Sequence, residues 1–349
     1  NDSSYLSSII DSNGEARAFS SAGSRNSWNF KNLLNYRNTF GKHRLDVLAG
    51  VEASKNTIKV NNIRGTGFSN STLKTPQDAA VVESYYNESA KTFLSILGRV
   101  NYDFDGKYLL SVTARRDGSS VSGRNKRWGL FPAVSLGYNI SEEPFFDGIK
   151  ETVNYLKLRA SYGVSGNAEI GNYAWVSTYA QANYNGASGI TLANIGDDEL
   201  GWESALQTNI GLSMQMFDGK FRLDVDVYEK LTQDLLLPYP VTVLSGLTQV
   251  TTNLGEIKNE GIEAMVGVTL VDKDDFTWDA ELTYAWNTNE VIDIGDNAEG
   301  IDIPGFGTTS IYIGKPIGIQ TIPIWVGVEP ATGQDIYQAL DGRHLTVAE

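Results

Sequence analysis

Cysteine is absent from this chain of 349 residues, and histidine occurs only twice, as His43 and His344. Without thiolates the chain can form neither a disulfide framework nor a cysteine-ligated metal site. His43 stands beside a short predicted turn and His344 near the end of the sequence, so we expect both to be solvated surface residues. Neither anchors a catalytic triad or a metal cluster. We therefore predict no catalytic residue, no metal ligand and no cofactor.

Long apolar runs and an excess of positive charge are also lacking. No window of about 18 apolar residues exists, so no membrane-spanning helix is predicted. The formal net charge is −14 and the basic residues are scattered. This argues against a nucleic-acid partner, because nothing would neutralise the phosphates. The sequence begins at Asn1 without a signal peptide, and we expect a mature or truncated product.

The chain does contain long runs in which apolar and polar residues alternate. Residues 94–104 place Leu94 and Val100 at alternate positions, with Ser95 and Arg99 between them. Successive side chains of a strand point to opposite faces, so each run has one apolar and one polar face. A strand in a soluble protein has ~5–6 residues, whereas ~9–11 tilted residues cross a bilayer in a membrane barrel. Runs of this length favour the membrane barrel.

Ten strands are predicted between about residues 27 and 289. They are 29–39, 42–53, 93–104, 107–117, 131–140, 156–164, 208–216, 220–231, 262–270 and 276–288. Short links, such as the Asp-Gly pairs at 105–106 and 218–219, are strong hairpin signals. They alternate with long connections at 54–92, 118–130, 165–207 and 232–261. This asymmetry is typical of an outer-membrane barrel. Residues 290–349 are predicted to be mostly outer loop and irregular.

The two faces of the predicted strands differ in charge. No apolar face holds a charge at its middle, where Lys or Arg facing lipid would cost roughly 2–4 kcal/mol; Asn32 is the one clear polar intrusion. The opposite faces are expected to form a polar lumen wall. Its members are Arg99, Arg159, Arg222, Asp224, Asp226, Asp279 and Glu281. Aromatic residues beside the short turns predict an interfacial girdle, with ordinary packing beside turns as the alternative. They are Phe40, Phe104, Tyr108, Phe217, Phe221 and Phe276.

The long connection at 165–207 carries aromatic rings among Asn and Gly. The rings are Tyr173, Trp175, Tyr179, Tyr184 and Trp202. Rings that stack and amides that hydrogen-bond are a usual surface for sugars or peptides, so these residues are candidates for contact with substrate or a partner. The alternative is that they only pack the loop against its neighbours. Residues 197–199 are acidic and are predicted to be solvated rather than to bind a cation.

Several segments, in a fixed order, resemble a known family. They are SVTARRDGSS at 111–120, RWGLFP at 127–132, ISEEPFF at 140–146, LKLRASYG at 156–163, IGNY at 170–173, LGWE at 200–203, QTNIG at 207–211, GEIKNEGIE at 255–263 and GKPIG at 314–318. Together they resemble the SusC/RagA-like TonB-dependent outer-membrane transporters, over roughly residues 93–320. The sequence departs from the family at 319–322, where IQTI stands in place of an aromatic stretch.

The resemblance implies an all-β, antiparallel up-and-down transmembrane barrel of 22 strands in the outer membrane of a Gram-negative, Bacteroidetes-like bacterium. It implies import of oligosaccharide or peptide, powered by the TonB–ExbB–ExbD complex through a plug domain, with a SusD-like surface lipoprotein as a lid. Residues 1–349 are then expected to form part of a single barrel domain in contact with lipid. The plug and the N-terminal extension are absent from this chain, so we expect a middle piece of a longer barrel.

Two other classes of function stay open on the sequence alone. One is a passive porin, or a structural barrel with surface-interaction loops. The other is a soluble β-rich protein that binds or degrades glycans, although no pair of carboxylates for hydrolysis can be selected. We predict a transporter and not an enzyme.

Overall fold

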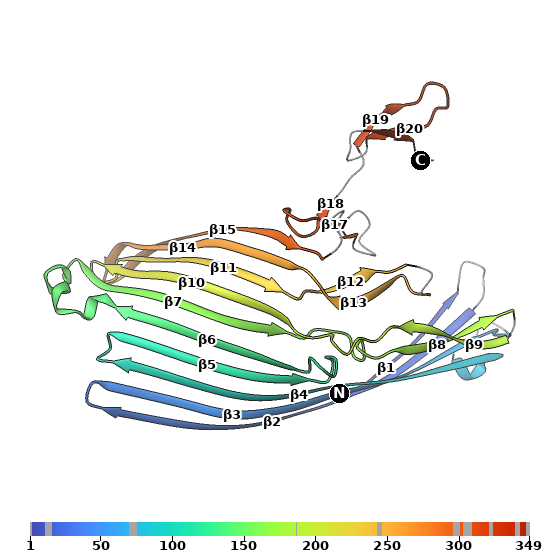
Figure 1. Cartoon of the computed structure of the whole chain (residues 1–349), viewed down its shortest axis with the longest axis horizontal. Coiled ribbons are helices and arrows are strands. Elements are labelled where there is room, and N and C mark those ends of the chain that lie inside the picture. Colours follow the sequence, from blue (N-terminus) through green and yellow to red (C-terminus); the bar gives the residue numbers. More distant parts are fainter. Residues whose placement is uncertain are drawn as a thin grey trace.

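The computed structural model describes residues 2–10, 16–69, 75–185, 187–242, 246–295, 301–302, 309–320, 324–338 and 343–346. One antiparallel sheet of eleven strands dominates these residues (Figure 1). Its strands, in spatial order, are β1 (Asp2–Ile10), β2 (Ala16–Phe40), β3 (His43–Thr66), β4 (Val81–Phe104), β5 (Tyr108–Ser119), β6 (Trp128–Asn139), β7 (Val153–Asn167), β10 (Glu203–Met216), β11 (Phe221–Gln233), β14 (Glu256–Lys273) and β15 (Phe276–Asp293). Each strand pairs with the next one of the sheet along the chain, as in an up-and-down barrel.

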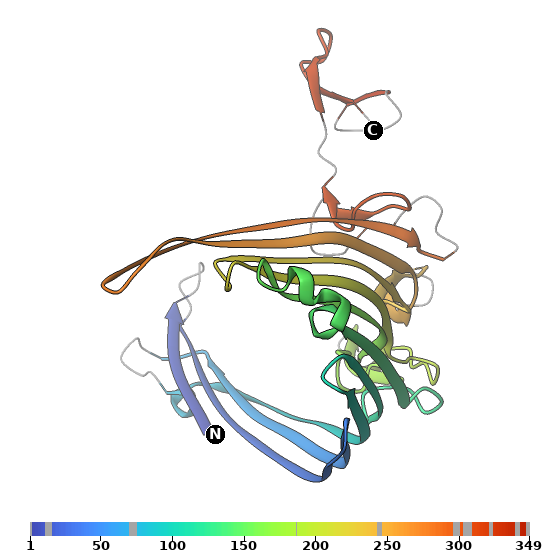
Figure 2. The same ribbon diagram turned by 90° about the vertical axis from the view of Figure 1, so that its left-hand side faces the viewer.

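The sheet is strongly curved. Figure 2, seen from the end with the short turns, shows it as an open trough with β1 and β15 on its two free edges. Two hairpins stand outside it in the long connections: β8 (Thr178–Tyr184) with β9 (Ala187–Asn194), and β12 (Leu236–Pro240) with β13 (Gln249–Asn253). The described residues contain no helix that is long and apolar enough to cross a membrane.

The register of the sheet aligns the apolar positions of successive strands. One row crosses ten strands, and all of its side chains are apolar except Asn38 of β2. Its members are Asn38, Leu45, Tyr102, Leu110, Leu136, Ala160, Ile210, Val227, Ile262 and Trp286. The apolar face is the more exposed one, with Leu34 74%, Leu136 58% and Leu282 70% exposed. Along β6 the apolar positions from Trp128 to Leu136 are exposed while the positions between them are half-buried. In water this arrangement would be inverted, so the apolar face is built for a different solvent.

Turns of very different length join the strands at the two ends of the sheet. At one end the connections are 41–42, 105–107, 140–152, 217–220 and 274–275. At the other end they are 67–80, 120–127, 168–202 and 234–255. The predicted alternation of short and long links is therefore present. All ten predicted strands are found in the sheet, and β1 is an eleventh that the sequence patterns did not indicate.

The predicted connection at 54–92 is wrong. β3 continues to Thr66 and β4 begins at Val81, with a continuous ladder of pairs from His43–Phe104 to Thr66–Val81. The sequence missed these extensions because residues 55–66 and 81–92 lack an apolar face. Beyond the bilayer both faces of a strand meet water, so the backbone ladder forms without two-sided patterning. β2, β3 and β4 therefore reach well past the outer edge of the apolar belt.

The remaining described strands are short and belong to the C-terminal part of the chain. They are β16 (Ile301–Asp302), β17 (Thr309–Ile311), β18 (Ile319–Gln320), β19 (Ile324–Val328), β20 (Asp335–Gln338) and β21 (His344–Thr346). β16–β18 and β19–β21 form two separate three-stranded sheets. The side chain of His344 lies outside the described residues. The assignment of 290–349 to an outer loop stays a prediction.

Buried apolar clusters lie in and beside the long connections, not along the sheet. Leu200 and Val121, with exposures of 0% and 1%, pack with Ala168 and Ile170. This group is called the rim cluster below. A second group joins Ile257 and Val291 near the outer ends of β14 and β15 to Ile294 and Ile311. The sheet itself encloses no core of its own, since one of its faces is apolar and exposed and the other is polar, so its cohesion rests on its ladders of hydrogen bonds.

An aromatic row crosses β2 to β6 at the short-turn end. Paired positions bring together Phe40, His43, Phe104, Tyr108 and Tyr138, with neighbouring ring centroids 4.9 to 6.3 Å apart. His43 was expected to be a solvated surface residue, and this was wrong. Its Nδ1 lies 2.7 Å from the Tyr102 hydroxyl, and the ring is half-buried because the strand register inserts it between two phenylalanines.

Candidate functional site: the polar face and the outer rim

Charged side chains on the polar face of the sheet pair across neighbouring strands. Arg159 of β7 donates from Nη2 to Asp226 Oδ2 of β11 at 2.8 Å and lies 3.8 Å from Asp224. The pair crosses β10 above Gly211, because register places Gly211 between Arg159 and Asp226. A Cβ on Gly211 would overlap Asp226 Oδ1 and stand 2.8 Å from Arg159 Nη2, so a larger residue would displace the ends of these two side chains.

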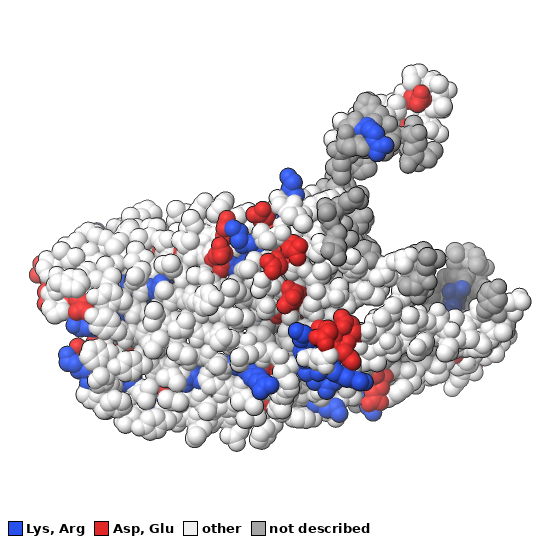
Figure 3. All heavy atoms as spheres, in the orientation of Figure 1, with Lys and Arg blue, Asp and Glu red and all other residues white. Residues whose placement is uncertain are grey.

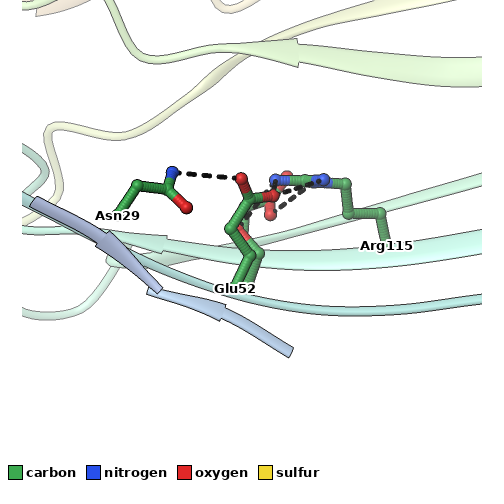
Figure 4. Close-up of polar contacts among 5 residues, drawn as sticks. Asn29, Glu52 and Arg115 are labelled. Atoms are coloured by element: carbon green, nitrogen blue, oxygen red, sulfur yellow. Dashed lines mark hydrogen bonds and ion pairs between the residues drawn. The ribbon is translucent and has the colours of Figure 1, made fainter. Parts of the chain in front are cut away.

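A second polar cluster spans four strands, and its central residues are drawn in Figure 4. Arg115 of β5 donates to both carboxylate oxygens of Asp117 at 2.7 and 2.9 Å and to Ser95 Oγ of β4 at 2.9 Å. Glu52 of β3 accepts from Arg115 at 3.4 Å and from Asn29 of β2 at 3.3 Å. Sequence reasoning did not select Arg115, although its place on the polar side of the alternation marked the correct face.

A third cluster lies closer to the short turns. Asp46 of β3 accepts a hydrogen bond from Arg37 of β2, and Arg99 of β4 lies 3.9 Å away. Arg44 of β3 pairs with Asp103 of β4 at 2.6 Å. Of the predicted wall residues, Arg99 and the Arg159–Asp224–Asp226 group thus enter ion pairs.

The other predicted wall residues also lie on the polar side. Register places Gly267 of β14 between Arg222 of β11 and Glu281 of β15. Asp279 of β15 accepts from Thr269 Oγ1 of β14 at 2.5 Å. The sheet therefore brings all seven predicted residues to one face, distributed over β4, β7, β11 and β15. They do not converge on a single point.

Between the charged clusters the polar face is lined by small neutral side chains. One row contains Asn101, Ser111, Ser135, Ser161 and Asn209. Two neighbouring hollows of about 540 and 320 Å³ share the three serines of this row. The larger hollow reaches Arg44, Asp46 and Arg159, and the smaller one reaches Gln207. The polar face thus has a strip of neutral hydroxyl and amide side chains with ion pairs beside it.

The outer connections 120–127 and 168–202 are locked to each other. Trp175 Nε1 donates to the Ser120 carbonyl at 3.1 Å, and its ring lies 5.5 and 5.4 Å from the guanidinium carbons of Arg124 and Arg127. Trp202 Nε1 donates to the Arg127 carbonyl at 3.2 Å, and its ring packs edge-on against Phe131 at 5.3 Å. Both indoles therefore hold the rim cluster together.

The three tyrosines among the predicted contact residues lie farther out. The Tyr173 hydroxyl accepts from the Ala90 backbone N–H at 3.2 Å, so it ties the loop to β4, although 46% of the residue is exposed. Tyr179 on β8 is 66% exposed and shares its face of the hairpin with Gln181 and Ile190. Tyr184 ends β8, and its side chain lies outside the described residues. Among the predicted contact residues whose side chains are described, Tyr179 is the most exposed and so the most accessible to a ligand.

The acidic residues at 197–199 help to join the connection 168–202 to the connection 120–127. Asp197 Oδ1 accepts from the Glu199 N–H at 2.8 Å, and Asp198 pairs with Arg124 at 3.7 Å. Asn125 donates to Glu199. The described residues hold no group of three or more His, Cys, Asp or Glu positioned to bind a metal ion.

The convex face is a belt with charged margins. Figure 3 shows its broad uncharged surface between the short-turn end and a band of acidic and basic groups toward the long connections. Along β6 the belt runs from Trp128 to Tyr138, and ten residues at ~3.3 Å each give ~25 Å of height at a strand tilt of ~40°. That height matches the apolar band of an outer-membrane barrel. The fold and its two faces define this chain as part of the wall of a membrane β-barrel.

Comparison with known proteins agrees with this class. The family described as TonB dependent receptor-like, beta-barrel, matches residues 1–327. The TonB-dependent receptor P39 of Formosa agariphila is 33% identical over 284 residues, which are 79% of this chain and 27% of the relative. The TonB-dependent receptor SusC of Bacteroides thetaiotaomicron is 30% identical over 283 residues, which are 76% of this chain and 27% of the relative.

A solved structure described as the RagAB peptide transporter matches the whole chain with a TM-score of 0.84 and 26% identity. The chain covers 40% of that structure, and it spans about a quarter of the length of the curated relatives. The chain belongs to the TonB-dependent receptor family, in its SusC/RagA-like branch, and forms barrel wall in the outer membrane. This is a family of transporters and not of enzymes.

Proposed function

We propose that this chain forms part of the barrel wall of a transporter that actively imports oligosaccharide or peptide nutrients across the outer membrane. The remaining wall, expected to complete 22 strands, and a plug domain belong to the longer protein. The observation that carries the proposal is the likeness over the whole chain, at 26% identity, to a structure described as a peptide importer. The family's dependence on TonB supplies the energy source, which is expected to be the TonB–ExbB–ExbD complex acting on the plug.

The polar face supports the proposal because it suits a path lined for hydrated cargo. Several of its carboxylates and guanidinium groups are paired, as in the Arg159–Asp226 and Arg44–Asp103 contacts. Paired charges allow a lumen to stay hydrated without creating a strong electrostatic potential of one sign. The neutral row around Ser135 offers hydroxyl groups that hydrogen-bond to either sugars or peptide groups.

The outer loops support capture of cargo at the rim. Trp175 and Trp202 fix the base of the 168–202 connection, and β8–β9 projects from that base. We propose Tyr179 as the ring of this set that contacts cargo, because it is exposed on a hairpin without charged residues between Gly171 and Gly196. An aromatic ring flanked by amides stacks on a sugar face or on a planar peptide group.

A SusD-like lipoprotein is the proposed partner at the outer rim. The structure described as the RagAB importer is known in a state named closed-closed and in another named open-open, and this chain matches both with TM-scores of 0.82 and 0.81. A lid that closes over the rim would meet the long connections at 67–80, 120–127, 168–202 and 234–255.

The test is uptake of labelled oligosaccharides and peptides by cells that produce the full-length protein, with and without a functional TonB. Active import predicts that uptake against a gradient disappears when TonB is removed. Equal uptake in both strains, together with steady conductance in planar bilayers, would instead identify a passive porin.

A matched pair of variants tests the role of the loop. Tyr179→Ala is expected to weaken uptake by roughly two- to tenfold, on the scale of the ~0.5–1.5 kcal/mol that a stacked aromatic contact contributes. Ile190→Ala changes a residue on the same hairpin face that is 76% exposed but cannot stack. Equal uptake by both variants would show that Tyr179 is not part of the binding surface.

A further inference from the structure

One short connection of the sheet is built differently from the others. Residues 41–42, 105–107, 217–220 and 274–275 are plain turns, whereas 140–152 contains two 3₁₀ helices, η2 (Ile140–Glu142) and η3 (Pro144–Ile149). This connection carries the ISEEPFF segment at 140–146, to which neither the lumen wall nor the outer rim assigns a role. Residues 140–152 are called the foot below.

The foot is attached to the apolar side of the sheet. Glu143 Oε1 accepts from the Tyr108 hydroxyl at 2.6 Å and from the Tyr138 hydroxyl at 3.4 Å, and Lys107 Nζ lies 3.0 Å from Oε2. Tyr108 and Tyr138 are stacked at 5.2 Å and share the face that carries Leu110 and Leu136. The foot therefore continues the apolar belt at its short-turn margin.

The foot is held in one conformation. Thr152 N–H donates to the Ile149 carbonyl at 2.9 Å, and Phe217 N–H of the next short turn donates to the Thr152 carbonyl at 2.9 Å. Asn154 Nδ2 donates to the Lys150 carbonyl at 3.0 Å, and Glu142 pairs with Lys150 at 3.8 Å. Phe146 is buried, with 3% exposure. Phe146 therefore takes part in attaching the foot to the sheet.

The neighbouring apolar side chains remain open. Phe145 is 73% exposed and Ile149 is 53% exposed, and Phe217 beside them is 52% exposed. Exposing several large apolar side chains to water is unfavourable. A cluster of such side chains therefore marks a surface that meets lipid or protein. Continuity with the belt through Tyr108 and Tyr138 favours lipid.

We infer that the foot is an interfacial anchor that inserts Phe145 and Ile149 into the inner leaflet of the outer membrane, at the boundary between headgroups and acyl chains. Glu142, Asp147, Lys150 and Glu151 give the same segment a charged side for the aqueous phase. Short amphipathic elements of this type lie in the plane of the membrane and bury their apolar side chains ~5–10 Å deep. The short turns of outer-membrane barrels face the periplasm, which assigns the leaflet.

The experiment measures lipid contact in the full-length protein reconstituted in phospholipid vesicles. Because this chain has no cysteine, a nitroxide label is attached to Phe145→Cys in a background without other reactive cysteines. Asp274→Cys, in the turn at 274–275, is the control at another short turn, and Asp147→Cys is the control within the foot. Accessibility to dissolved oxygen, which partitions into lipid, is compared with accessibility to a water-soluble nickel complex.

The expected result is an oxygen-to-nickel ratio roughly fivefold higher at 145 than at either control, as for a side chain below the headgroups. Equal ratios at 145 and 274 would show that Phe145 faces water and would overturn the inference. Low accessibility to both reagents at 145 would also overturn it, because the residue would then be covered by protein. Ile149→Cys repeats the measurement if Phe145→Cys fails to assemble, and brominated lipids must quench a fluorophore at the same positions.

Discussion

The sheet and the outer rim of this barrel wall use apolar residues in opposite ways. In the sheet, Leu136 and Leu282 are 58% and 70% exposed, and neighbouring strands are held by backbone ladders. In the rim, Leu200 and Val121 are almost completely buried, and indole N–H groups of Trp175 and Trp202 fix the connecting chain. The rim connections join strands of this same sheet, so the difference reflects the surrounding solvent rather than the fold.

The comparison shows how one chain can follow two rules of folding. Lipid offers no hydrophobic driving force to the sheet, and what it demands is that every backbone polar group be satisfied. Water drives the rim to bury its few apolar side chains, as in any small soluble domain. The same kind of substitution should therefore have different effects in the sheet and in the rim, and four experiments test this difference.

The largest expected effect comes from removing the centre of the rim cluster. Leu200→Ala should cost about 2–5 kcal/mol of local stability, because the cavity forms among Val121, Ala168 and Ile170, which cannot close it fully. Connections 120–127 and 168–202 should become protease-sensitive and exchange their amide protons faster, while the sheet stays assembled. Ile190→Ala removes similar apolar atoms from an exposed position and should change neither. Loss of the whole barrel in Leu200→Ala would contradict a separate rim.

A charge in the belt should cost about 2–4 kcal/mol. Val134→Arg places a guanidinium group on the apolar face near the middle of β6, where lipid cannot solvate it. Unfolding by urea in lipid vesicles measures the difference from the native protein. Ser135→Arg is the matched control, because the next residue of the same strand points to the polar face. Equal destabilisation by both substitutions would mean that the convex face does not meet lipid.

A methyl group at Gly211 should cost about 1–3 kcal/mol by overpacking beneath the Arg159–Asp226 pair. The loss should shrink when Gly211→Ala is combined with Asp226→Ala, because the carboxylate that the added methyl group would overlap is then absent. Chemical unfolding of the single and double variants measures this coupling. Gly148→Ala, where a Cβ meets nothing within 4 Å, should leave stability unchanged. Strict additivity of the Gly211 and Asp226 substitutions would exclude the proposed cause.

The smallest effect concerns pH at the foot. The Tyr108 hydroxyl and then Lys107 hold the pKa of Glu143 below its ordinary value of 4.5. A lowered carboxyl pKa contributes stability above the ordinary value, and this contribution is lost as the pH falls through the lowered pKa. Cleavage of 140–152 by an acid-active protease should therefore increase below about pH 4.5 in the native protein. In Glu143→Gln, the susceptibility of 140–152 to the protease should not rise in this way as the pH falls. A native protein that also lacks the rise would refute the role of the Glu143 carboxylate in holding the foot.

Sequence patterns predicted the sheet well where two solvents act on one strand. Residues 94–104 and 208–216 alternate because one side meets lipid and the other meets the lumen, and both runs lie within observed strands. The same reasoning failed at 55–66 and 81–92, where water on both sides removes the pattern while the ladder continues. It also failed at His43, because its ring contacts come from β2 and β4, which the sequence cannot place beside it.

The candidate site was predictable by face but not by pairing. The alternation put Arg159 and Asp226 on the polar side, whereas only the register over Gly211 brings them together. The loop rings could not be sorted from sequence at all. Trp175 and Trp202 reach backbone carbonyls of a different connection, while Tyr179 stays exposed, and these outcomes depend on how two loops meet. Whether the seven wall residues line a transport path stays a prediction for the full-length protein.

The two-faced strands, the alternation of short and long links and the family could all be predicted from the amino-acid order, because each depends on residues close together in the chain or on their order. The folded sheet was needed to show which charges are paired, which loop aromatics are packed, and that β2 to β4 extend beyond the belt. Those features depend on contacts between segments far apart in sequence, and their free energy comes from burial and register that no single strand possesses.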